Sequence, residues 1–192
     1  RRYNIKWSNE FVIFPHSKGT NGKMEKINLS KYPNANKYFN QQKEKLMKRE
    51  YVKKSGKDWY EIWNTRDITW FNQDKIVTPN LSKTNNFCVD FADNNYKDYF
   101  FLDHDCYGII LKSKKKADYL YILGLLNSKL MEFFIKQKSP MFSGSYYKYH
   151  TQYMEIVPIK EPSSDVKLKI IKDVQQILKY KKQNEEKKSN EL

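Results

Sequence analysis

The sequence predicts an α+β domain, with a mixed core of short strands around a buried helix and a long amphipathic helix at the C-terminal end. Three observations predict it. Residues 119–134 carry apolar side chains on nearly every helical face, which is typical of a helix packed on several sides. Short runs rich in aromatic and β-branched residues precede that segment and favour strands. Residues 163–178 place apolar side chains at steps of three and four, which indicates one narrow helical stripe.

The N-terminal part is predicted to contain a strand, a turn and a surface helix. Residues 3–15 are rich in aromatic and β-branched residues and end at a proline, so we expect a strand there. Residues 16–23 are polar, contain two glycines and are expected to form a turn. Helical spacing follows Pro33, a residue that fits the first helical turn, and ends near residues 49–51.

The middle of the chain is predicted to supply most strands of the core. Short apolar runs separated by polar turns predict strands at residues 75–79, 87–91, 99–102 and 107–111. Aromatic pairs flank a turn at Arg66 and Asp67 before the first of these runs. We expect the tryptophans of this region to lie in the core, namely Trp59, Trp63 and Trp70.

The last two helices have different expected roles. Residues 119–134 are too short and too polar to span a membrane, so we expect one buried helix, in which Gly124 indicates close approach by a neighbour. The apolar stripe of the final helix is predicted to dock on another helix, in this chain or in its parent protein, or to pack back on its own domain. The residues predicted for a helix partner are Val166, Ile170, Val174 and Ile177.

Composition points to a polyanionic partner. The 192 residues carry a net charge of +14 and include 15 tyrosines, so basic groups and flat rings are both abundant. Codon bias in an AT-rich genome is an alternative explanation of the same composition. The two cysteines imply no disulfide framework, so a cytoplasmic location is expected, and a first residue other than Met suggests a segment of a longer protein.

No catalytic constellation is recognised in the sequence. The six glycines are scattered, which is unlike a nucleotide-binding loop. His104 and Cys106 make one short pair of metal-ligating types, but a zinc site needs a second pair, which Cys88 alone does not supply. Residues 103–106 are expected to form an ordinary Asp-rich turn. We therefore expect a segment that binds and does not catalyse, with no metal and no cofactor of its own.

Several stretches resemble a known family in their order and spacing. The most specific is Leu-Tyr-Ile-Leu-Gly-Leu-Leu-Asn-Ser-Lys at residues 120–129, which is similar to a Leu-Gly-(Ile/Leu)-Leu-Asn-Ser helix. The others are Val-Ile-Phe-Pro at 12–15, Tyr-Pro at 32–33, Tyr-Phe at 38–39, Leu-Met-Lys-Arg at 46–49, Trp-Tyr at 59–60, Lys-Ile-Val-Thr-Pro at 75–79, Phe87 with Asp90, Ser-Tyr at 145–146 and Ile-Val-Pro-Ile at 156–159. Together they resemble the C-terminal target-recognition domain of TaqI-like DNA methyltransferases and related fused restriction–modification enzymes, and the similar module of type I specificity subunits.

The resemblance implies a DNA target-recognition domain at residues 1–160 and a spacer or docking helix with a frayed basic tail at 161–192. It also implies that a preceding domain of the parent protein transfers the methyl group from S-adenosylmethionine. The Asn-Pro-Pro-Tyr-type catalytic motif and the cofactor-binding glycines of the full enzymes are missing from this sequence. Whether the parent also cuts DNA is left open, and the likeness favours adenine as the modified base.

Residues that touch DNA are expected in three polar loops at 16–23, 64–83 and 143–150. Lys and Arg neutralise phosphates, while base edges are read by side chains with fixed donor and acceptor geometry. Arg66 is the residue we favour for base reading, because its planar guanidinium lies beside aromatic residues. At least one of Tyr146, Tyr147 and Tyr149 is expected in the core. The predicted DNA-binding residues are Ser17, Lys18, Lys23, Arg66, Gln73, Lys83, Ser143, Ser145, Tyr147, Lys148 and His150.

Three other classes of function remain open at this point, one of which is an autonomous enzyme. A protein-interaction module with a basic surface would not bind DNA even at low salt. A module that binds single-stranded nucleic acid by tyrosine stacking would prefer single strands to duplex.

Overall fold

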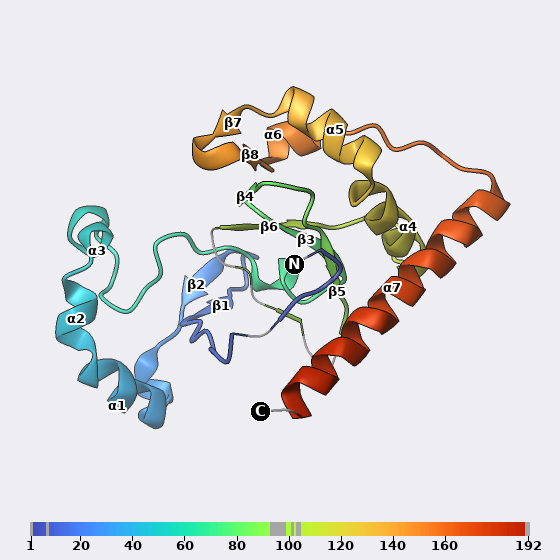
Figure 1. The fold of residues 1–192 in the computed structure, drawn as a ribbon. Coiled ribbons are helices and arrows are strands. Elements are labelled where there is room, and N and C mark those ends of the chain that lie inside the picture. Colours follow the sequence, from blue (N-terminus) through green and yellow to red (C-terminus); the bar gives the residue numbers. More distant parts are fainter. Residues whose placement is uncertain (1, 7, 93–98, 101, 103–104, 191–192) are drawn as a thin grey trace. The chain divides into compact units, whose positions relative to one another are not determined.

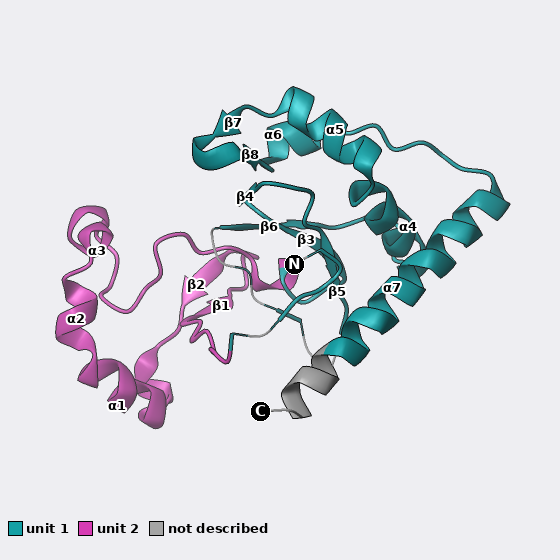
Figure 2. Cartoon of the chain, in the orientation of Figure 1, with its two compact units in different colours: residues 1–8, 71–192 teal, residues 9–70 magenta. Residues whose placement is uncertain are grey.

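The protein is described by a computed structural model that covers residues 2–6, 8–92, 99–100, 102 and 105–190, with residues 185–190 as backbone only. The chain forms two compact units (Figures 1 and 2). Unit 1 contains residues 1–8 and 71–192, and unit 2 contains residues 9–70. Helices and small antiparallel sheets are both present, and a long helix closes the chain, so the predicted α+β class is confirmed.

Unit 1 contains a three-stranded antiparallel sheet in the order β5-β3-β6. Strand β3 (Lys75–Pro79) lies in the centre, between β5 (Cys88–Asp90) and β6 (Cys106–Ile109). The first four residues of β3 are buried, as expected of a central strand covered on both faces. The strands predicted at 75–79, 87–91 and 107–111 are confirmed, although β6 begins and ends earlier than expected. Residues 99, 100 and 102 form no strand, and residue 101 lies outside the described residues.

The segment predicted as one buried helix forms two helices, which corrects the prediction. Helix α4 (Lys116–Leu126) ends at Asn127, and α5 (Lys129–Lys138) begins after Ser128. The Asn127 side chain accepts from the Phe87 backbone amide at 3.1 Å and donates to the Phe87 carbonyl at 3.0 Å. The Ser128 hydroxyl accepts from the backbone amide of Met131 and caps α5. A tertiary contact and a cap therefore end the first helix.

The break also changes which residues are buried. Met131 and Ile135 of α5 face the core, while Leu130 and Phe133 are 74% and 64% exposed. The prediction that the whole segment is buried is wrong for these two residues. Only α4 is apolar around its circumference, and its buried residues are Tyr119, Leu120, Tyr121, Leu123 and Leu126.

Helix α7 (Ser164–Asn190) packs along α4 (Figure 1). A Cβ atom added at Gly124 would lie 2.8 Å from Ile170 Cγ2 and 2.9 Å from Val174 Cγ2. The close approach predicted for Gly124 is therefore made by α7. Lys167 of α7 also forms an ion pair with Asp118 of α4 at 2.6 Å. Two members of the predicted stripe thus pack on the chain's own α4.

The core of unit 1 joins the β5-β3-β6 sheet, α4, α5 and α7. Ile76 from β3, Leu123 from α4 and Val174 from α7 belong to one buried cluster. Tyr149 is fully buried, so one of the three tyrosines in the 146–149 stretch is in the core, as expected. Lys75 and Asp90 form a buried ion pair at 2.6 Å.

A second sheet of unit 1 has the order β4-β8-β7. It contains β4 (Leu81–Ser82), β7 (Met141–Phe142) and β8 (Tyr146–Lys148), all antiparallel. A 3-10 turn, η3 (Ser143–Ser145), connects β7 to β8, and the short helix α6 (Thr151–Met154) follows β8.

Unit 2 begins with a hairpin of β1 (His16–Lys18) and β2 (Met24–Lys26). The strand predicted at residues 3–15 is wrong for its described residues, which contain no strand. Tyr3 and Asn9 have positive φ angles of 62° and 60°, and an extended strand does not accommodate that conformation. The segment predicted as a turn, residues 16–23, supplies β1 and the turn of the hairpin, while β2 follows it.

The helical part of unit 2 consists of short pieces. They are η1 (Leu29–Lys31), α1 (Pro33–Gln41), α2 (Lys43–Met47), α3 (Glu50–Ser55) and η2 (Ile68–Trp70). Pro33 is the first residue of α1, as predicted. Trp63 and Trp70 are 62% and 59% exposed, and Trp59 is partly buried, so the prediction that all three lie in the core is wrong. None of the helices in the described part of the chain is long and apolar enough to cross a membrane.

Candidate nucleic-acid interface

The register of the β4-β8-β7 sheet places two aromatic rings and two lysines on one face. Phe142 pairs directly with Tyr146, so their side chains lie on the same face. Lys148 follows Tyr146 by two residues and shares that face. Lys83 follows the end of β4 and reaches the same face, because its Nζ lies 5.2 Å from the centre of the Tyr146 ring. We call Lys83, Phe142, Tyr146 and Lys148 the aromatic–lysine face.

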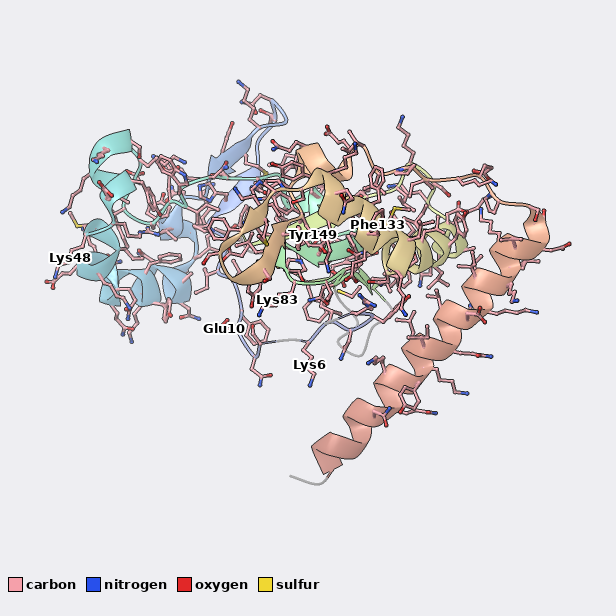
Figure 3. The ribbon with its side chains drawn as sticks, turned by 45° about the horizontal axis from the view of Figure 1, so that its top comes forward. Lys6, Glu10, Lys48, Lys83, Phe133 and Tyr149 are labelled. Carbon is pink, nitrogen blue, oxygen red and sulfur yellow. The ribbon has the colours of Figure 1, made fainter. Side chains whose placement is uncertain are left out.

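The cations and rings of this face are paired. Besides the Lys83–Tyr146 contact, the Lys148 Nζ lies 5.4 Å from the centre of the Phe142 ring. Phe142 and Tyr146 are 49% and 39% exposed, and Lys83 is also exposed. Figure 3 labels Lys83 at this sheet and Phe133, which comes from α5. Exposed rings and cations are the groups that contact bases and phosphates in nucleic-acid complexes.

The tip of the same sheet presents two of the predicted DNA-binding serines. Ser143 and Ser145 are exposed in η3, on either side of Gly144. Gly144 and Ser145 have φ angles of 69° and 67°, and this left-handed turn reverses the chain. The turn places both serines directly between the two strands that carry Phe142 and Tyr146.

Tyr147 lies on the opposite face of this sheet. Its ring packs against the core and is covered by the Lys136 Nζ at 5.5 Å from the ring centre, so it has a structural role. His150 lies between the rings of Tyr107 and Tyr153, at centroid distances of 5.7 and 6.3 Å. The remaining candidate of unit 1 is Gln73, whose amide oxygen accepts from Lys114 at 3.1 Å.

Unit 2 brings its own predicted residues together. Lys18 of β1 forms an ion pair with Asp67 at 2.9 Å, which ties the hairpin to the turn that carries Arg66. The hydrogen bond from Lys18, and then the bonds from Thr69, lower the pKa of Asp67 to about 2. Arg66 is exposed, and its guanidinium has no hydrogen bond or ion pair with the described residues. Ser17 and Lys23 are exposed on the same hairpin.

A buried histidine lies in the hairpin strand that carries Ser17 and Lys18. His16 is 7% exposed, and its Nε2 lies 3.5 Å from a carboxylate oxygen of Glu61. Burial lowers the pKa of His16, while the carboxylate of Glu61 opposes that effect. The hairpin therefore contains a buried histidine, His16, whose neutral form is favoured.

Side chains of metal-ligating and nucleophilic types are present among the described residues. Among them there is no group of three or more His, Cys, Asp and Glu side chains that could hold a metal ion. Burial raises the pKa of the Cys88 thiol to about 12, so it is a poor nucleophile. Asp103 and His104 of the predicted turn at 103–106 lie outside the described residues.

Sequence reasoning missed part of the candidate interface. Phe142 was not predicted as a site residue, and Tyr146 was considered only as one of three tyrosines. The signal would have been the pairing of residue 142 with 146 across a turn that contains Gly144. Two strands of two and three residues are too short to show an alternating pattern.

Comparison with known proteins identifies the family of the chain. Residues 1–159 match the TaqI-like C-terminal specificity domain. The chain is 31% identical over 184 residues to the type II methyltransferase M.BanIII of Aneurinibacillus aneurinilyticus, a match that covers 94% of this chain and 30% of that protein. It is 27% identical over 160 residues to the type II methyltransferase M.BstVI of Geobacillus stearothermophilus, covering 83% of this chain and 26% of that protein.

The chain therefore spans less than a third of the length of either relative. The family match covers most of the chain, and the resemblance noted in the sequence is confirmed. The chain belongs to the TaqI-like C-terminal specificity domains, and it is a DNA-recognition module of the restriction–modification type.

Proposed function

We propose that this chain selects a short sequence in duplex DNA for a methyltransferase domain that precedes it in the same polypeptide. The observation that carries the proposal is the family match over residues 1–159, joined to a net charge of +14. Both relatives are named as methyltransferases, which supports methyl transfer from S-adenosylmethionine by the parent protein. The names of these relatives do not mention DNA cleavage, so the proposal is confined to methyl transfer.

The proposal assigns contacts in each unit separately. In unit 2, Arg66 reads a base edge, while Ser17, Lys18 and Lys23 bind the phosphates beside it. In unit 1, Lys83, Ser143, Ser145 and Lys148 contact the backbone from the β4-β8-β7 sheet. Lys18 is paired with Asp67, so its contribution to phosphate binding is smaller than that of Lys23, which forms no ion pair with the residues that the structure describes.

The proposal also concerns partners and location. The relatives are much longer than this chain, which supports a catalytic domain of the same polypeptide as the partner. Ile170 and Val174 pack on α4, so Val166 and Ile177, both exposed, are the stripe residues that remain for a partner helix. The cytoplasm is the proposed location because the DNA substrate lies there.

The test compares Arg66→Ala with Arg66→Lys in binding to a library of duplex sites. Arg66→Ala is expected to relax the choice at one base position and to cost about 1–3 kcal/mol at the preferred site. Arg66→Lys keeps the charge but lacks the planar fork, so it is expected to lose the same selectivity while keeping the salt dependence of binding. Unchanged selectivity in both variants would show that Arg66 does not read a base.

A salt series on the unmodified chain tests the class of function. Duplex affinity that falls steeply with rising salt supports the proposal, because bound lysines and arginines release counterions from phosphates. The absence of binding to random duplex at low salt would favour a protein-interaction module.

A further inference from the structure

We propose that the aromatic–lysine face of unit 1 is a stacking site for unpaired DNA bases, so that the chain binds single-stranded DNA in addition to duplex. This inference rests on the proposed DNA recognition and adds a second form of DNA, bound by the rings of Phe142 and Tyr146. It concerns the two rings of that face, which the predicted phosphate and base contacts did not include.

The geometry of the two rings carries the inference. Phe142 and Tyr146 are directly opposite each other in the antiparallel register of β7 and β8. Opposite residues have Cβ atoms about 4.5–5.5 Å apart, so the two aromatic side chains start close together on one face of the sheet. Large aromatic rings that remain about half exposed on a short sheet present faces on which bases can stack.

The two lysines supply the electrostatic part of the site. Lys83 and Lys148 each lie over one of the rings, at 5.2 and 5.4 Å from the ring centres. An exposed contact between a lysine and a ring is weaker than the stacking of a base on that ring. An arriving base is therefore expected to displace the ammonium group, which then moves to the neighbouring phosphate.

The turn at Gly144 leaves space for a single strand of DNA to reach the two rings. Gly144 has a φ angle of 69°, and a Cβ atom added there would meet only the Tyr146 ring, at 3.8 Å. The exposed hydroxyl groups of Ser143 and Ser145 add hydrogen-bond donors at the same end of the rings. A base in a duplex is already stacked on its neighbours, so an exposed pair of rings favours bases that have lost their partners.

The test measures binding of a labelled 12-nucleotide single strand and of the matching duplex to the full chain by fluorescence anisotropy. The variants are Phe142→Ala and Tyr146→Ala. The matched control is Phe133→Ala, which removes an exposed aromatic ring from α5, outside this sheet. Each alanine on the face is expected to weaken single-strand binding about ten-fold, which corresponds to about 1.4 kcal/mol, and Phe133→Ala to leave it unchanged.

Stacking has its own spectroscopic readout. A single strand that contains 2-aminopurine is expected to lose fluorescence on binding to the unmodified chain and to Phe142→Tyr, which keeps a ring, but not to Phe142→Ala. Thermal unfolding of each variant checks that the fold is retained.

The outcomes separate this inference from the proposed function. Equal losses of single-strand and duplex affinity in the two ring variants, or no loss in either, would overturn the stacking site while leaving duplex recognition intact. Ring-dependent single-strand binding in a chain that shows no salt-dependent duplex binding would support the stacking site and refute the proposed duplex recognition.

Discussion

Unit 1 and unit 2 each carry part of the predicted recognition surface, but different interactions hold them together. Unit 1 has a contiguous apolar core that includes Ile76, Leu123 and Val174, with a buried ion pair beneath it. In unit 2 the buried apolar residues are few, and Leu29 and Phe39 are the main ones. Edge-to-face contacts of Phe39 with Trp59 and Tyr60 and exposed ion pairs provide much of the rest.

The difference separates two ways to support a loop that is proposed to contact DNA. In unit 1 the short sheet that carries the aromatic–lysine face is anchored by Tyr149, whose hydroxyl donates to the buried Asn85 side chain at 2.9 Å. In unit 2 the Arg66 turn is tied to the hairpin by the exposed Lys18–Asp67 pair. Exposed pairs contribute little to stability and weaken with salt. The contacts of unit 2 are therefore expected to adapt more readily than those of unit 1.

The largest expected effect concerns the buried ion pair of unit 1. Lys75→Met leaves the Asp90 carboxylate buried without its cation and is expected to cost about 3–5 kcal/mol of unfolding free energy. The double variant Lys75→Met/Asp90→Asn is expected to recover more than half of that loss. Urea unfolding followed by circular dichroism measures both. A single variant as stable as the unmodified chain would show that the pair does not support the core.

A smaller effect is expected where α4 meets α7. Gly124→Ala places a methyl group within 3 Å of Ile170 and Val174, so the helices must separate, at a cost of about 1–3 kcal/mol. Val174→Ala removes one of the two clashing methyl groups, so the double variant is expected to be more stable than the sum of the single effects predicts. Strict additivity in this cycle would show that α7 is not packed on Gly124 in solution.

The smallest effect is a pH dependence confined to unit 2. Burial lowers the pKa of folded His16 below the value of 6.5 that we assign to the unfolded chain. The unfolded chain therefore binds a proton more readily, and the stability of unit 2 is fully present above pH 6.5 and falls as the pH drops below it. Urea unfolding followed by tryptophan fluorescence measures this effect, because three of the four tryptophans, Trp59, Trp63 and Trp70, lie in unit 2.

The matched control for this effect is His16→Phe, which removes the titrating group. Its unfolding midpoint is expected to change less between pH 7.5 and 5.5 than that of the unmodified chain. The same pH dependence in both proteins would assign the effect to another group. The Lys75→Met variant also tests whether the two units unfold together. They do so if this substitution lowers the urea midpoint measured by tryptophan fluorescence as much as the midpoint measured by circular dichroism.

The sequence by itself determined several features of this protein. An apolar run bounded by polar turns was sufficient to predict strand β3, and Pro33 was sufficient to predict the start of α1, because both signals are local. The stripe of α7 also followed from spacing alone, and the approach at Gly124 followed from the presence of a glycine within a helical segment. The Leu-Gly-Leu-Leu-Asn-Ser stretch and the other quoted motifs were sufficient to identify the family, and the match over residues 1–159 confirmed it.

The tertiary structure decided what depends on residues distant in the sequence. Helix α4 ends at Asn127 because its side chain binds the backbone of Phe87, forty residues away, and no local pattern contains that information. The exposure of Trp63 and Trp70 could not be predicted from residue type. The pairing of β4 with β8 brings Lys83 to Tyr146, which creates the aromatic–lysine face. Strand pairing between distant segments is a property of the whole core, so the candidate stacking site appeared only in the folded chain.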